Sequence, residues 1–146
     1  MAHPNIIESE TELGEIVRGM RTVAVVGMKD ESKADEAAHA IPRMMHERGL
    51  TLIPVNPKIR STLGLRSLNA VGELDVAVDV MDVFRRPEAI PGIADRVLAL
   101  PENLRPAVVW LQSGIRHDEA AQRLAEAGIK VVQDRCLGVY VSRYRR

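Results

Sequence analysis

The stretch TVAVVGMKDESKADEAAHA, from Thr22 to Ala40, places a β-branched run before one glycine, a charged turn and an alanine-rich segment. A buried strand followed by a glycine turn and a helix is the outline of a phosphate-binding motif, because the helix start offers unpaired N–H groups. Only Gly27 is present where dinucleotide fingerprints carry two or three glycines, and no Gly-Lys-Ser/Thr completes a P-loop. The stretch therefore predicts an anion-binding turn of neither type, with a plain α/β turn as the alternative.

Helices and strands alternate along the rest of the chain. A capping-box pattern, Ser9-x-x-Glu12, begins an expected helix at Ser9–Met20. A second helix is expected from an N-cap at Ser32 to a stop at Gly49, with a kink at Pro42. The expected strands are Arg21–Val26, Leu50–Val55, Leu74–Val80, Ala107–Leu111 and Ile129–Val132. The later helices are expected at Arg86–Leu100 and His117–Ala127, and residues 57–72 are expected to form a loop.

This alternation predicts an α/β fold: a doubly wound parallel sheet of about five strands, with helices on both faces and an additional N-terminal helix. With 146 residues, the chain is expected to form one domain over 1–146, in which 1–20 is an N-terminal helical extension.

Composition narrows the function classes. Twenty basic and twenty acidic side chains give a net charge of zero, and the chain has one Trp and one Phe, so nucleic acid is not an expected partner. The single Cys136 excludes an intramolecular disulfide and a Cys-rich metal site. The acidic N-terminus lacks a signal-peptide pattern, and no apolar run reaches the roughly 18–20 residues of a membrane span, so we expect a cytoplasmic protein.

In doubly wound sheets, ligands bind beyond the carboxyl ends of the strands. Asn56 stands where an acidic residue would bind the ribose of NAD, which disfavours that cofactor. Basic residues near these ends suggest a rim for a phosphorylated ligand, although an ordinary solvated surface is the alternative. They are Lys29, Lys33, Lys58, Arg60, Arg85 and Arg86.

Four motifs in order, VNP (55–57), DVFRRP (82–87), WLQSG (110–114) and DRC (134–136), resemble the small stand-alone CoA-binding domain family. This family is similar to the N-terminal CoA-binding domain of the succinyl-CoA synthetase α-subunit, and the resemblance covers about 22–137. It implies a Rossmann-like fold that holds coenzyme A or an acyl-CoA across the strand ends. The first turn departs from the family pattern at Met28 and Lys33.

Carried over by motif, the resemblance gives each strand end a part of the cofactor. Gly27, Met28 and Lys29 would meet the diphosphate, with Lys33 beside them. Asn56, Pro57 and Lys58 would line the nucleotide. Val83, Phe84 and Arg85 would close over the cofactor, and Gln112, Ser113 and Gly114 would border the pantetheine path.

The sequence shows no catalytic constellation. His39 and His46 are expected on the exposed face of the second helix, and His117 is expected as a helix cap or surface residue. Ser113 has no identifiable base. Asp79 and Asp82 suggest a carboxylate pair at a strand end, but we favour a role for Asp82 in orienting the loop or accepting from backbone N–H groups.

Cys136 is expected to be buried and inert. The alternative is a thiolate beside Arg135 that exchanges with the CoA thiol. We therefore expect a non-catalytic binder of CoA or acyl-CoA. The alternatives are a CoA-presenting component of an acyl-CoA enzyme with a separate catalytic partner, and a thiol redox protein that forms a Cys136–CoA mixed disulfide. A homodimer or another protein partner stays open.

Overall fold

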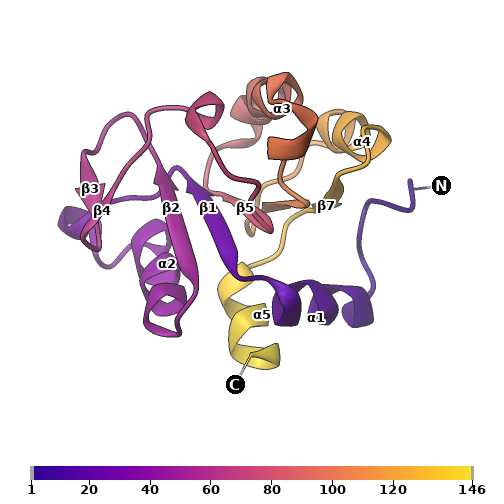
Figure 1. Cartoon of the computed structure of the whole chain (residues 1–146). Helices are drawn as coiled ribbons and strands as arrows, with labels where there is room; N and C mark the ends of the chain where they lie inside the picture. The colour runs from indigo at the N-terminus through magenta and orange to yellow at the C-terminus, as the bar shows by residue number, and fades with distance from the viewer. Residues whose placement is uncertain (1, 146) are drawn as a thin grey trace.

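A five-stranded parallel sheet lies at the centre of the computed structural model, which describes residues 2–145 (Figure 1). The strands are β1 (Thr22–Val26), β2 (Thr51–Val55), β5 (Val80–Val83), β6 (Val108–Leu111) and β7 (Lys130–Val132). Their order is β2-β1-β5-β6-β7. The chain winds outward from β1 to β2 and then returns to the other side of β1, so the strand order reverses between β1 and β5. This doubly wound, Rossmann-like topology confirms the expected fold class.

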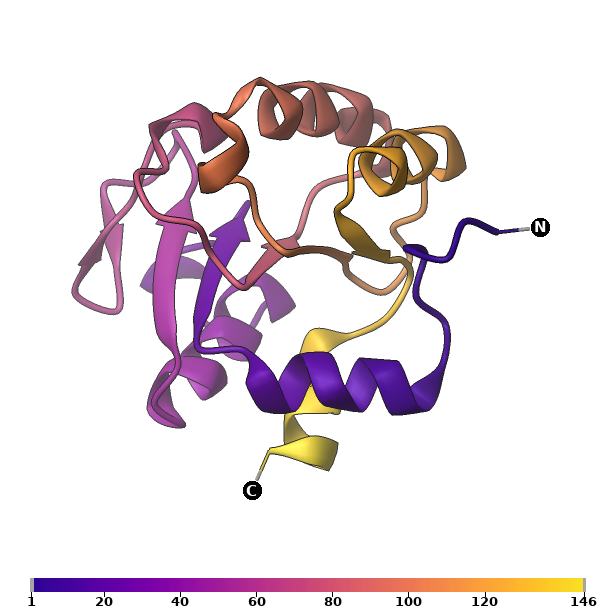
Figure 2. The same ribbon diagram turned by 45° about the vertical axis from the view of Figure 1, so that its right-hand side comes forward.

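Helices cover both faces of the sheet (Figures 1 and 2). One face carries α1 (Glu10–Gly19), α2 (Ala37–Glu47) and α5 (Leu137–Tyr144), and the other carries α3 (Ile90–Ala99) and α4 (Asp118–Glu126). Alternate residues of β1 enter the two cores: Val23 and Val25 pack toward α1, α2 and α5, whereas Ala24 and Val26 pack toward α3 and α4. Burial on both faces explains why the strands read as continuous apolar runs.

Several expected boundaries are confirmed to within one or two residues. The side chain of Ser9 accepts a hydrogen bond from the Glu12 N–H (3.4 Å) and begins α1. His117 caps α4, because its Nδ1 accepts from the Ala120 N–H at 3.1 Å. The expected helix near Pro87 begins as a 3₁₀ turn at Pro87–Ala89 and continues as α3.

The prediction that the second helix begins after an N-cap at Ser32 is wrong. Asp30 accepts hydrogen bonds from the N–H and the hydroxyl of Ser32, and these stabilise a separate 3₁₀ turn at Glu31–Lys33. The α-helix begins only at Ala37, with Glu36 at the N-cap. It continues through Pro42 to Glu47.

The third sheet strand was also misplaced, because it covers Val80–Val83 rather than Leu74–Val80. Leu74 and Val78 are buried apolar residues of an irregular segment, so their side chains gave the same signal as a strand. The shift places Asp82 inside β5, in register with Val25 of β1 and Trp110 of β6.

Four further elements, two of them paired in a hairpin, were not expected. The 57–72 segment contains a short hairpin of β3 (Ser61–Thr62) and β4 (Leu65–Arg66), followed by a 3₁₀ turn at Val71–Glu73. The last element of the described residues is α5, which packs beside α1 and α2 (Figure 2). A helix of eight residues is too short to give a clear periodic pattern.

Candidate ligand-binding site

A cavity of about 480 Å³ lies at the carboxyl ends of β1, β5 and β6, where the strand order reverses. This is the position at which open α/β sheets bind ligands, and the volume falls within the roughly 300–1,000 Å³ of small-molecule sites. It is lined by Lys29, Glu36, Ala37, Ala38, Ile41, Phe84, Arg85, Arg86, Pro87, Gln112, Ser113, Gly114, Ile115 and Cys136.

The N-terminus of α2 forms one wall of this cavity. The N–H groups of Ala37 and Ala38 have no hydrogen-bond partner among residues 2–145, and Glu36 provides no side-chain cap. Unpaired N–H groups and the positive end of the helix dipole favour an anion at this position. The helix start is therefore suited to a phosphate, and it lies at Ala37 rather than directly after the glycine turn.

Pro42 allows the loop after β1 to form a hydrogen bond with α2. Proline has no N–H, so the Ala38 carbonyl one turn earlier loses its helical donor. That carbonyl instead accepts from the N–H of Lys29 at 3.1 Å. The loop after β1 is thereby fixed against α2, and the proline within the helix has a compensating contact.

The charged side chains around the cavity are predominantly basic. Lys29 Nζ lies 2.8 Å from Glu36 Oε1, and this hydrogen bond holds the pKa of the Glu36 carboxyl below its usual value. Arg85 and Arg86 are exposed and form no salt bridge within the described part of the chain. An anionic ligand would thus meet two uncommitted guanidinium groups, while it would share Lys29 with Glu36.

The backbone conformation and packing around Gly27 require a glycine at this position even without a ligand. Its φ is +84°, and a Cβ at this position would lie 2.4 Å from the Phe84 carbonyl oxygen. Its N–H donates to the Val55 carbonyl at 2.9 Å. Since the N–H groups of Gly27 and Lys29 both have internal partners, the Lys29 ammonium is the contact that these two residues offer a phosphate.

The structure brings together some of the residues expected at the site and separates others. Those that line the cavity are Lys29, Phe84, Arg85, Gln112, Ser113 and Gly114. Met28 and Val83 are fully buried behind its wall, so their side chains are core residues. Lys33, Pro57 and Lys58 are exposed and lie outside the cavity.

Asn56 also lies outside the cavity and links two loops. Its Nδ2 donates to the Met28 carbonyl at 2.8 Å, and its Oδ1 accepts from the Lys58 N–H at 2.9 Å. Nδ2 therefore holds the turn after β2 against the turn after β1, while Oδ1 stabilises the turn after β2 itself.

Asp79 and Asp82 do not form the suggested carboxylate pair. Asp79 precedes β5 and accepts from the N–H groups of Arg21 and Thr22 at the amino end of β1 (2.7 and 3.0 Å). Asp82 is fully buried inside β5, where its Oδ1 accepts from Gln112 Nε2 at 2.7 Å. Burial raises the pKa of Asp82 to about 8. Asp82 accepts from no backbone N–H within residues 2–145, and its partner Gln112 is the first residue of the loop after β6.

Cys136 is half-buried and lines the cavity, so the expectation of a buried cysteine was wrong. It lies at the N-cap of α5, directly before Leu137. A thiol in this position is accessible to a ligand that enters the cavity.

His39 was wrongly expected on the surface. It is 1% exposed, and its Nδ1 lies 2.9 Å from the Lys29 carbonyl and 3.4 Å from Thr62 Oγ1. Glu31 accepts from the Leu63 N–H at 2.8 Å and from the Thr62 hydroxyl at 3.2 Å. The β3–β4 hairpin, which the sequence did not predict, thus covers the histidine and anchors the Lys29 loop.

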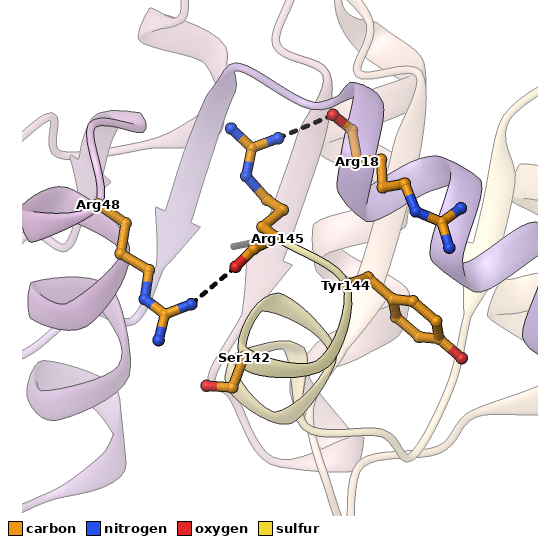
Figure 3. A pocket seen from close by; sticks show the side chains of 5 residues that line it. All are labelled: Arg18, Arg48, Ser142, Tyr144 and Arg145. Atoms are coloured by element: carbon orange, nitrogen blue, oxygen red, sulfur yellow. Dashed lines mark hydrogen bonds between the residues drawn. The ribbon is translucent and has the colours of Figure 1, made fainter.

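A larger hollow of about 720 Å³ lies at the opposite edge of the sheet, where helices lead into the strands (Figure 3). Its lining residues are Arg18, Arg48, Ser142, Tyr144 and Arg145. Arg145 donates to three carbonyls at the end of α1, at 2.9–3.0 Å. Figure 3 shows the bond to Arg18 and the bond of 2.9 Å that Arg48 donates to the Arg145 carbonyl. These contacts cap helix C-termini, which explains the cluster without a ligand.

The cavity wall contains residues that the sequence did not indicate. Ala37, Ala38 and Ile41 have small or apolar side chains with no chemical signature, and their role depends on where α2 begins. Within residues 2–145, no group of three His, Cys, Asp or Glu side chains is arranged to hold a metal ion. No helix of that part combines the length and apolar character needed to span a membrane.

A family model described as CoA binding domain matches residues 21–142. The uncharacterized protein YneT of Bacillus subtilis (strain 168) is 37% identical over 131 residues, which cover 90% of this chain and 93% of YneT. A solved structure from Thermus thermophilus, cell-free ID.343, is 40% identical, with a TM-score of 0.84 over 94% of this chain and 99% of that one.

A more distant neighbour is the dinucleotide forming acetyl-coenzyme A synthetase 1 of Ca. Korarchaeum cryptofilum. It is 19% identical, with a TM-score of 0.59, and the match covers 75% of this chain and 25% of that one. At this identity the likeness concerns the fold alone.

Proposed function

Since the chain belongs to the CoA binding domain family, we propose that it binds coenzyme A or an acyl-CoA in the cavity beyond β1, β5 and β6. The observation that carries the proposal is the juxtaposition of the free α2 N-terminus with Lys29, Arg85 and Arg86 around one cavity. This arrangement suits a diphosphate, because helix N–H groups and cationic side chains both favour negative charge.

The rest of the cavity is suited to the other end of the molecule. Ile41, Phe84 and Ile115 offer apolar surface, and Gln112 and Ser113 offer polar contacts to the pantetheine chain. The nucleotide end would extend over Asn56, Pro57 and Lys58, which lie beyond the cavity. In this arrangement the ligand crosses the strand ends from β2 toward β6.

We propose binding without catalysis by this chain. Ser113 has no hydrogen-bonded histidine or carboxylate in the described residues that would activate it as a nucleophile. The buried Asp82 contacts Gln112 rather than a nucleophile. These features support a carrier, a sensor or a CoA-holding module over an enzyme.

Isothermal titration calorimetry with CoA, acetyl-CoA and NAD tests the proposal. We expect CoA to bind more tightly than NAD, and Lys29→Ala to weaken CoA binding by about 1–2 kcal/mol, the scale of a charge-assisted hydrogen bond. Lys130→Ala is the matched control, because this exposed lysine lies at the amino end of β7, at the other edge of the sheet. Absence of CoA binding, or an equal affinity for NAD, would refute the proposal.

Cys136 supports a second candidate function, reversible thiol exchange with CoA disulfides, because its side chain lines the cavity. The Cys136 thiolate would attack one sulfur of the disulfide, form a Cys136–CoA mixed disulfide and release the other CoA as a thiolate. Mass spectrometry after incubation with CoA disulfide should reveal one CoA adduct that a reductant removes. The same adduct on Cys136→Ser, or none on the wild type, would exclude this function.

A further inference from the structure

Asp82 occupies an unusual position for a carboxyl group. It is fully buried in the middle of the sheet, with Val25 and Trp110 as its neighbours on the adjacent strands. Its Oδ1 accepts from Gln112 Nε2 at 2.7 Å, while Oδ2 is buried without a partner. Burying a carboxyl group with incomplete hydrogen bonding is costly, and an apolar residue would fit this strand better. The carboxyl therefore calls for an explanation beyond packing.

Gln112 connects this carboxyl group with the cavity. It directly follows β6 and lines the cavity, although only 4% of its surface is exposed. A glutamine amide has one donor end and one acceptor end. Because Nε2 is directed to Asp82, Oε1 is the end that remains. It makes no hydrogen bond within residues 2–145, and it is not one of the fully buried atoms without a partner.

We propose that Asp82 is a positioning residue that holds the Gln112 side chain with Oε1 toward the cavity, where Oε1 accepts a hydrogen bond from an amide N–H of the bound ligand. The pantetheine chain of CoA carries two such amides, whereas its nucleotide part carries none. This inference rests on the proposed function, and it assigns to Gln112 the recognition of the pantetheine half.

The protonation of Asp82 is compatible with this role. Burial raises its pKa to about 8, so the group carries a proton near neutral pH. A proton on Oδ2 leaves Oδ1 as a carbonyl-like acceptor for Gln112 Nε2. The pair can therefore keep this orientation without a buried negative charge.

A double-mutant cycle with two ligands tests the inference. The variants are Asp82→Leu, Gln112→Met and the double variant, titrated calorimetrically with CoA and with adenosine 3′,5′-bisphosphate, which lacks pantetheine. Each single variant should weaken CoA binding roughly three- to tenfold, the range of one net hydrogen bond. Binding of the bisphosphate should remain unchanged. In the Gln112→Met background, Asp82→Leu should have no further effect, because Asp82 acts through Gln112.

Asp82→Asn is the conservative variant, and it keeps the experiment informative if Asp82→Leu fails to fold. Its side chain keeps an acceptor oxygen, so CoA should bind within about twofold of the wild type. Gln112→Met leaves Asp82 in place and removes Oε1 itself, so its loss of CoA affinity tests the contact independently.

The outcomes separate this inference from the proposed function. Normal CoA binding by Gln112→Met, equal losses for both ligands, or additive effects in the double variant would overturn the inference while CoA binding by the wild type stands. If the wild type binds the bisphosphate as tightly as CoA, the cavity does not recognise pantetheine, and the inference fails. A wild type that binds neither ligand would refute both.

Discussion

Replacement of Gly27 by alanine tests whether the turn after β1 is shaped by the protein or by its ligand. The added Cβ would lie 2.4 Å from the Phe84 carbonyl oxygen, and the residue would have to keep a φ of +84°. The positive φ costs an L-residue about 1–2 kcal/mol. Overpacking against backbone typically adds about 1–3 kcal/mol. We therefore expect Gly27→Ala to lower the free energy of unfolding by about 2–5 kcal/mol.

Gly49 provides a matched control. Its φ is +91°, but a Cβ there has no neighbour within 4 Å, so Gly49→Ala should show the backbone cost alone. Urea denaturation of the two variants isolates the steric contribution as their difference. Phe84 follows β5 and lines the cavity, and its backbone must shift to relieve the contact. Gly27→Ala should therefore also weaken CoA binding, while Gly49→Ala should leave it unchanged. Equal destabilisation of the two variants would refute the close approach of Gly27 to the Phe84 carbonyl.

Three further predictions concern charge and helix capping. Glu36→Gln removes the carboxylate that binds Lys29 and so frees the ammonium for the ligand. Calorimetry should show that CoA binds two- to fivefold more tightly, a gain of about 0.4–1 kcal/mol in binding free energy. Weaker binding would contradict the role of Lys29. Burial raises the pKa of Asp82 from 3.8 to about 8, so the folded state binds more protons than the unfolded chain between these values, and stability falls as pH rises through this window. The Tm of Asp82→Asn should therefore exceed that of the wild type by an amount that grows from about pH 4 to about pH 8, and a pH-independent difference would contradict this. Arg145→Ala removes a side chain that donates to three carbonyls at the end of α1. Urea denaturation should therefore show a free energy of unfolding lower by about 1–2 kcal/mol, with unchanged CoA affinity. Weaker CoA binding would instead indicate that the hollow lined by Arg18, Arg48 and Arg145 takes part in binding.

The candidate site was partly predictable because strand ends can be found from the sequence. Lys29, Phe84, Arg85 and the Gln112–Gly114 segment follow three different strands, and the parallel sheet brings them to one edge. The prediction failed for residues that lie near strand ends but do not face the cavity. Val83 is a core residue because β5 extends further than its pattern indicated, and Asn56 holds a neighbouring turn.

Local sequence determined four of the five sheet strands (β1, β2, β6 and β7) and the starts of α1 and α4. β-branched runs, the caps at Ser9 and His117, and the glycine turn after β1 depend on neighbours within a few residues, so they can be read along the chain. Tertiary structure alone decided the burial of His39 and the pairing of Asp82 with Gln112. His39 is covered by a hairpin distant in the sequence. The Asp82–Gln112 pairing depends on the register of parallel strands that are buried on both faces, and their uniformly apolar sequences carry no alternation to reveal that register.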